Sequence, residues 1–128
     1  GGSDGRACGE GPSIILPPRV SLSISMALHE LATNALKYGA LSAPGGRVEV
    51  RWSVEREPPS PYPTALRLTW REEGGPPVEQ PSSEGFGSRL LRVTASELGG
   101  EMDLDWKREG LRWELRFPLT SRDFDLAA

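Results

Sequence analysis

Strict alternation of apolar and polar residues in four segments constrains the fold of this chain most strongly. The apolar positions of these segments are Val48, Val50, Trp52 and Val54; Leu66, Leu68 and Trp70; Met102, Leu104 and Trp106; and Leu111, Trp113, Leu115 and Phe117. A period of two places such residues on one face of a strand, so each segment is expected to be buried on one side only. The last two segments are joined by Arg108-Glu109-Gly110, which predicts a hairpin.

Two further segments carry a helical period. The first runs from about Val20 to Tyr38, after Pro17-Pro18 and before Gly39, which we expect to be a C′ glycine. The second runs from about Gly87 to Leu98, before Gly99-Gly100. Their apolar faces are Ile24, Leu28, Leu31 and Ala35 in the first, and Leu90, Leu91, Thr94 and Leu98 in the second. The order helix, two strands, loop, helix, hairpin predicts an α+β fold, a two-layer sandwich with a mostly antiparallel sheet and helices on one face.

The length of 128 residues fits one domain. We expect residues 1–13, rich in glycine, to be a loose lead-in whose first three residues are typical of a cloning remnant. Residues 14–119 are expected to form the domain, and residues 120–128 a C-terminal tail. The chain is therefore interpreted as a piece of a longer protein.

Composition excludes several classes of function. A net charge of −3 and a pI of about 5.2 do not fit a nucleic-acid or anionic-membrane surface. The single cysteine, Cys8, allows no internal disulfide, and the single histidine, His29, excludes zinc sites built from several histidine or cysteine ligands. No apolar run approaches the roughly 20 residues that span a bilayer, and no secretory signal is recognised. We therefore expect a cytoplasmic location.

Glu30, Asn34 and Lys37 form the first cluster of residues suited to chemistry. At i, i+4 and i+7 they share a stripe about 60° wide, roughly opposite the apolar stripe of the first helix. An Asn oxygen can bind magnesium, a lysine can offset phosphate charge, and a carboxylate can orient or deprotonate water. Taken alone, the stripe is explained as well by the solvated face of an amphipathic helix.

Two glycine-containing segments are the other candidates. Glu72 precedes Glu73-Gly74-Gly75-Pro76 at a strand end, where a carboxylate can accept hydrogen bonds from an adenine amino group; an ordinary turn is the alternative. Gly85-Phe86-Gly87-Ser88-Arg89 opens the second helix, and a helix N-terminus suits phosphate. Gly-x-Gly alone is a weak signal, and neither the dinucleotide-binding nor the P-loop pattern is complete.

Together and in this order, the three segments resemble the HWE group of histidine kinases. HELATNALKYGALS at 29–42 is similar to the N box of that group, WREEGGP at 70–76 to its divergent G1 box, and GFGSRLL at 85–91 to its G2 box. The group is named after a histidine, a tryptophan and a glutamate, which correspond to His29, Trp70 and Glu72 here.

The resemblance implies the Bergerat ATP-binding fold, shared with gyrase-type and MutL-type ATPases, with ATP and Mg²⁺ as cofactors. It implies Asn34 as the magnesium ligand, and Glu30 and Lys37 as the catalytic residues, with Lys37 near the phosphates. Residues 77–84 would form the ATP lid. The further nucleotide contacts that it implies are Tyr38 and Gly74, together with Glu72 at the adenine. It also implies Gly85 and Gly87 at the hinge of the lid, and Ser88 and Arg89 near the phosphates.

The implied function is that of the catalytic domain of a bacterial two-component sensor histidine kinase, a phosphorelay transferase. Its implied partners are its own dimerisation domain with the phosphoacceptor histidine, an upstream sensor domain and a response regulator. Because the acceptor histidine of such kinases lies on that separate domain, a supporting role is expected for His29. Two alternatives stay open: an ATP-responsive interaction switch without catalysis, and a non-kinase ATPase of the same fold.

Overall fold

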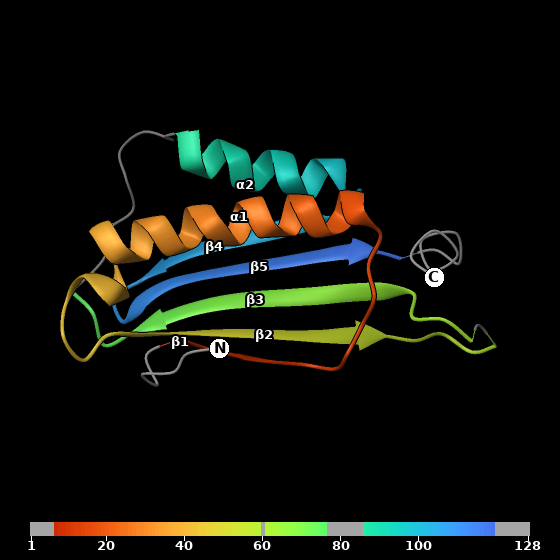
Figure 1. Cartoon of the computed structure of the whole chain (residues 1–128), viewed down its shortest axis with the longest axis horizontal. Helices are drawn as coiled ribbons and strands as arrows, with labels where there is room; N and C mark the ends of the chain where they lie inside the picture. The colour runs from red at the N-terminus through yellow and green to blue at the C-terminus, as the bar shows by residue number, and fades with distance from the viewer. Residues whose placement is uncertain (1–6, 60, 77–85, 120–128) are drawn as a thin grey trace.

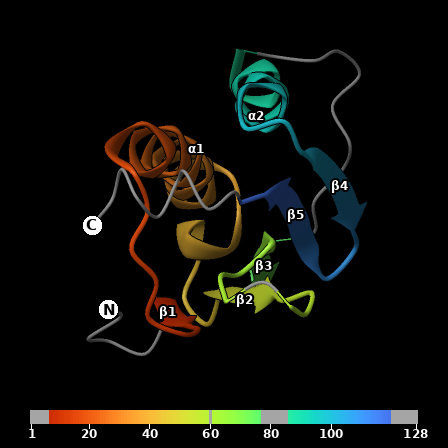
Figure 2. The same ribbon diagram turned by 90° about the vertical axis from the view of Figure 1, so that its right-hand side faces the viewer.

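The computed structural model describes residues 7–59, 61–76 and 86–119. Within these ranges, two α-helices cover one face of a five-stranded sheet (Figure 1). The view along the strands in Figure 2 shows both helices on the same side, with α2 nearest β4. The structure thus confirms the predicted two-layer α+β sandwich.

The sheet has the strand order β1-β2-β3-β5-β4. The strands are β1 (Ala7–Glu10), β2 (Arg47–Glu55), β3 (Ala65–Glu73), β4 (Glu101–Lys107) and β5 (Gly110–Pro118). The pairs β2–β3, β3–β5 and β4–β5 are antiparallel, and β1 runs parallel to β2 at the sheet edge. The four alternating segments are the four long strands.

Strand β1 corrects the expectation that all of residues 1–13 are a loose lead-in. Residues 7–10 pair with β2 from Val48 to Arg51, although three of the four are exposed. An edge strand held by backbone hydrogen bonds needs no apolar face, so periodicity gives no signal for it.

Helix α1 spans Pro18–Lys37 and begins with proline in its first turn, where the missing N–H costs no helical hydrogen bond. Val20, Ala27, Leu31 and Ala35 are its buried residues, while Ile24 and Leu28 pack partly against the core. Helix α2 spans Phe86–Glu97 and buries Leu91, Thr94 and Ala95. A short 3-10 helix, η1 (Ala40–Ser42), follows α1.

The core lies between the helices and the inner face of the sheet. Its largest fully buried side chains are Trp113, Phe117, Leu31 and Leu115. Burying a side chain of this size stabilises a fold by about 1.5–3 kcal/mol. No helix in the described ranges is long and apolar enough to cross a membrane.

Candidate functional site

The polar stripe of α1 is partly enclosed. Glu30 and Asn34 are half-buried, and the Asn34 Nδ2 donates a hydrogen bond to the Glu30 Oε1 at 3.2 Å. An ionised carboxylate only accepts hydrogen bonds, so Asn34 must turn its amide nitrogen toward Glu30. Its Oδ1 therefore points elsewhere and has no hydrogen-bond partner among the described residues. The Asn34 Oδ1 is therefore a hard oxygen atom on the helix surface that is available as a donor to a cation.

Lys37 and Tyr38 lie at the end of α1. Lys37 is in the last turn and Tyr38 is the C-cap residue, and both side chains are exposed, Tyr38 by 73%. A cation at a helix C-terminus is favourable for the helix dipole, so the position of Lys37 has a structural reason as well. Both side chains are free to reach a ligand at this end of the helix.

Glu72, near the end of β3, is a buried carboxylate with 4% of its surface exposed. Its Oε1 accepts a hydrogen bond from the Ala40 N–H, and its Oε2 accepts one from the Trp70 Nε1–H, each at 2.9 Å. A carboxylate offers about four acceptor positions, so two remain after these bonds. The predicted adenine acceptor is thus anchored by two protein donors and retains acceptor capacity.

Close packing around Glu72 explains two glycines that flank it in space. A Cβ at Gly39 would overlap the Glu72 Oε1, and a Cβ at Gly110 would overlap the Glu72 carbonyl oxygen. Gly39 follows α1 as predicted, but its φ of −109° is not left-handed. Glycine is needed at this position because there is no room for a Cβ beside Glu72, and not because of the backbone conformation. Gly74, predicted as a nucleotide contact, opens the following turn at a φ of +77°.

The start of α2 supplies the third predicted segment. Gly87 lies in its first turn, Ser88 is half-buried and Arg89 is exposed, while Gly85 and the predicted lid at 77–84 fall outside the described residues. Figure 1 shows the end of α1, the end of β3 and the start of α2 at the same end of the molecule. The fold therefore brings together three segments that are far apart in sequence.

His29, on α1, is exposed and makes no hydrogen bond or ion pair with any residue that the structure describes. Nothing in its described surroundings indicates that it orients Glu30 or Asn34.

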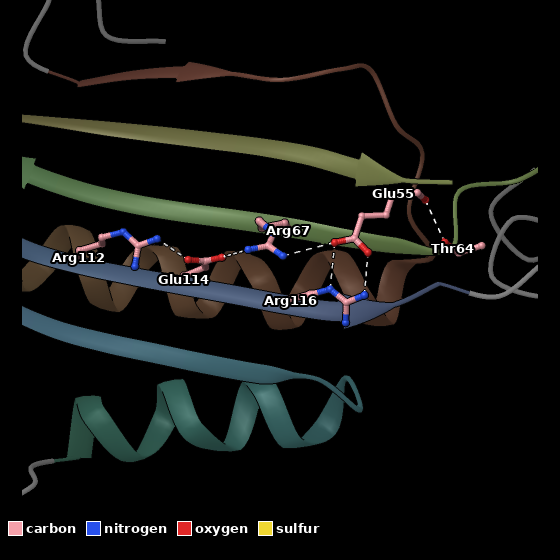
Figure 3. A network of polar contacts seen from close by, with 6 residues as sticks. All are labelled: Glu55, Thr64, Arg67, Arg112, Glu114 and Arg116. Atoms are coloured by element: carbon pink, nitrogen blue, oxygen red, sulfur yellow. Dashed lines mark hydrogen bonds and ion pairs between the residues drawn. The ribbon is translucent and has the colours of Figure 1, made fainter. Parts of the chain in front are cut away.

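The described residues with shifted pKa values lie on the outer face of the sheet (Figure 3). Hydrogen bonds from Arg116, together with Arg67, lower the pKa of Glu55 from 4.5 to about 2. Partial burial raises the pKa of Glu114, but hydrogen bonds from Arg112 and Arg67 outweigh it, so the pKa is lowered. These groups form an ion-pair ladder across β2, β3 and β5, on the face away from the helices. Their shifts therefore mark a structural network and not the candidate site.

A hollow of about 400 Å³ lies on the other flank of α1, between the segment after β1 and the inner face of β2 and β3. Its lining has no charged side chain, and comprises Pro12, Ser13, Ile14, Leu16, Ile24, Leu28, Val50, Trp52, Leu66 and Leu68. A triphosphate needs cationic or N–H donors, so this hollow does not have the chemistry of a nucleotide site.

Residue types did not predict the Ala40 N–H donor or the bond between Trp70 and Glu72. A backbone donor has no residue signature. The i, i+2 spacing in a strand does place Trp70 and Glu72 on one face, and was the available signal for the second contact.

The fold matches that of histidine kinase catalytic domains. The histidine kinase domain of a blue-light-activated kinase from Erythrobacter litoralis EL346 superposes with a TM-score of 0.72 at 23% identity, over 96% of this chain and 56% of that one. The histidine kinase ThkA, in a crystal structure in complex with the response regulator protein TrrA, matches with a TM-score of 0.60 at 17% identity, over 89% of this chain and 34% of that one.

Sequence comparison shows a nearer relationship. The blue-light-activated histidine kinase of Brucella anthropi is 41% identical over 116 residues, which are 89% of this chain and 23% of that protein. The chain thus spans about a quarter of the length of this curated relative. No protein-family model matches it. The chain is a relative of the histidine kinases and has the fold of their catalytic domain.

Proposed function

We propose that this chain is the ATP-binding catalytic domain of a two-component sensor histidine kinase of the HWE group, with the Bergerat fold. The observation that supports this best is the convergence of the α1 end, the β3 end and the α2 start at one end of the sandwich (Figure 1). These three segments carry an Asn oxygen, a lysine, a buried carboxylate and a helix N-terminus.

The described residues fit Mg²⁺ and ATP by their chemistry. The Asn34 Oδ1, without a partner in the described ranges, is a hard oxygen donor of the kind that magnesium binds. A bound magnesium ion would supply charge neutralisation at the phosphates. Glu30 holds the amide of Asn34 in the orientation that presents this oxygen, and its carboxylate can orient a water molecule or accept a proton from it. In this proposal Asn34 is the metal ligand, and Glu30 is catalytic.

The remaining predicted residues have roles that follow from their positions. Lys37 compensates phosphate charge, and Tyr38 offers an exposed ring beside it. Glu72 and Gly74 receive the adenine, because the carboxylate keeps acceptor positions and the glycine adds no side chain there. Gly87, Ser88 and Arg89 offer N–H donors and a cation to the phosphates at the start of α2.

The proposed reaction delivers the γ-phosphate of ATP to a histidine on a separate dimerisation domain. Phosphoryl transfer is mainly positioning and charge neutralisation, which these groups can supply without covalent catalysis. The proposed partners are that domain, an upstream sensor domain and a response regulator; ThkA was crystallised with one. A cytoplasmic location fits this proposal.

The test is to mix the domain with the dimerisation segment of its own kinase and labelled ATP–Mg²⁺. Acid-labile phosphate on the segment's histidine supports the kinase, and Glu30→Gln should reduce it strongly. ATP binding without transfer in any combination would favour an ATP-responsive switch. ATP turnover that never labels histidine would favour a non-kinase ATPase.

A further inference from the structure

Trp70 and Glu72 form a hydrogen-bonded pair inside the molecule. Both are almost fully buried, with 5% and 4% of their surface exposed. The Trp70 Nε1–H donates to the Glu72 Oε2 at 2.9 Å, while the other oxygen accepts from the Ala40 N–H at 2.9 Å. The carboxylate is therefore fixed by one donor on its own strand and a second on the segment that follows α1.

Neighbouring contacts leave this carboxylate little room to rotate. Gly39 lies so close to the Oε1 that a Cβ would overlap it, and Gly110 packs as closely on the carbonyl oxygen of Glu72. Two donors set the plane of the carboxylate, Gly39 packs against one of its oxygens, and Gly110 packs against the backbone of the same residue.

Trp113 shows that a buried tryptophan in this sheet does not have to make such a bond. It lies directly opposite Trp70 in the β3–β5 register and is 0% exposed. Its Nε1–H has no hydrogen-bond partner within the described part of the chain. Packing alone therefore accounts for Trp113, whereas Trp70 combines packing with a directed bond to Glu72.

We propose that Trp70 is a positioning residue for the nucleotide site. Its indole N–H and the Ala40 N–H hold the Glu72 carboxylate in one orientation, and this ties the end of β3 to the end of the helix that carries Lys37 and Tyr38. The inference rests on the proposed function, because the orientation matters for an adenine amino group. Trp70 acts through Glu72 and does not touch the nucleotide.

Recognition of the nucleotide base should therefore depend on Trp70, although Trp70 itself does not contact the nucleotide. A carboxylate accepts hydrogen bonds from the 6-amino group of adenine and repels the 6-oxo group of hypoxanthine. If Trp70 orients this carboxylate, losing its N–H should weaken the preference for ATP over inosine triphosphate. A general loosening of the fold would instead weaken the binding of both nucleotides to the same extent.

The experiment compares Trp70→Phe with Trp113→Phe as a matched control, since both remove an indole from neighbouring buried positions. Kd values for ATP and for inosine triphosphate, each with Mg²⁺, are measured by calorimetry. Trp70→Phe should lower the ATP preference about three- to tenfold, the range expected for weakening one hydrogen bond to a charged acceptor, and Trp113→Phe should preserve it. Equal preference in both variants overturns the proposal.

A second measurement needs no nucleotide. The amide exchange rate of Ala40, followed by NMR, should rise about three- to tenfold in Trp70→Phe and stay unchanged in Trp113→Phe. Unchanged Ala40 exchange in both variants contradicts the proposed positioning, even if the wild-type domain binds no nucleotide and the proposed function fails. If Trp70→Phe does not fold, Gly39→Ala replaces it, because its Cβ would displace the other oxygen of the same carboxylate, the Oε1 that accepts from the Ala40 N–H. Retained ATP preference and unchanged Ala40 exchange in that variant count against the proposal.

Discussion

Replacing Glu72 by glutamine tests whether this carboxylate stabilises the domain as well as its site. The carboxylate accepts two hydrogen bonds at 2.9 Å, from the Ala40 N–H and the Trp70 Nε1–H, in a buried position. Glutamine keeps one oxygen acceptor and turns an NH₂ group toward the other donor. One charge-assisted bond is then lost and a buried N–H is left unpaired, which together cost about 2–4 kcal/mol. This is a large part of the roughly 5–15 kcal/mol that stabilise a typical domain.

Urea unfolding measures this loss, with Glu73→Gln as the control. Glu73 is the next residue of β3, and its carboxylate makes an exposed ion pair with Arg47 at 2.6 Å. A surface pair of this kind contributes about 0–1 kcal/mol. The reasoning is refuted if Glu72→Gln lowers the free energy of unfolding no more than Glu73→Gln does, at equal m-values.

Three further predictions concern the core, the outer face and the site. Leu31→Ala, at 1% exposure, should cost about 2–5 kcal/mol in urea unfolding. Leu36→Ala, at 62% exposure on the same helix, should cost no more than about 0.5 kcal/mol, and equal losses would contradict the assigned helix orientation. The pKa of Glu55 is lowered from 4.5 to about 2. The contribution of this carboxylate to stability is therefore complete above pH 4.5 and is lost as the pH falls through about 2. The urea midpoint should therefore fall less steeply with acid in Glu55→Gln, and parallel profiles would disprove this. Lys37→Ala should raise the Kd for ATP about tenfold, whereas Lys107→Ala, the same charge change on β4, should leave it unchanged; equal effects would show that net charge alone matters.

The long elements were predictable because their burial is periodic. Strands β2 to β5 each pack one face against the core, and that face is mostly buried in β3 and β5 and mostly half-buried in β2 and β4. Helix α1 buries one stripe, so alternation and helical period identified these elements. Strand β1 was not predictable, because an exposed edge strand is defined by backbone pairing with β2 and not by side-chain pattern.

The candidate site was predictable in its parts and not in its connections. The spacing of Glu30 and Asn34 on a helix predicted their proximity, and the structure adds the bond that orients the amide. The attachment of Glu72 to Ala40 joins residues 32 positions apart in sequence, through a backbone donor that any residue could supply. Only the tertiary structure shows it. The roles of these residues toward ATP and Mg²⁺ stay predictions.

The most direct test of the account is the magnesium dependence of ATP binding. Calorimetry on the wild-type domain should show ATP binding that weakens when Mg²⁺ is removed by chelation. Asn34→Ala should lose this dependence and bind ATP–Mg²⁺ at least about tenfold more weakly, because it removes the proposed oxygen ligand. Ser25→Ala, an exposed position on the same helix, should bind as the wild type does. An Asn34→Ala variant that binds ATP–Mg²⁺ normally, or a folded wild-type domain that shows no magnesium-dependent binding, would contradict the account.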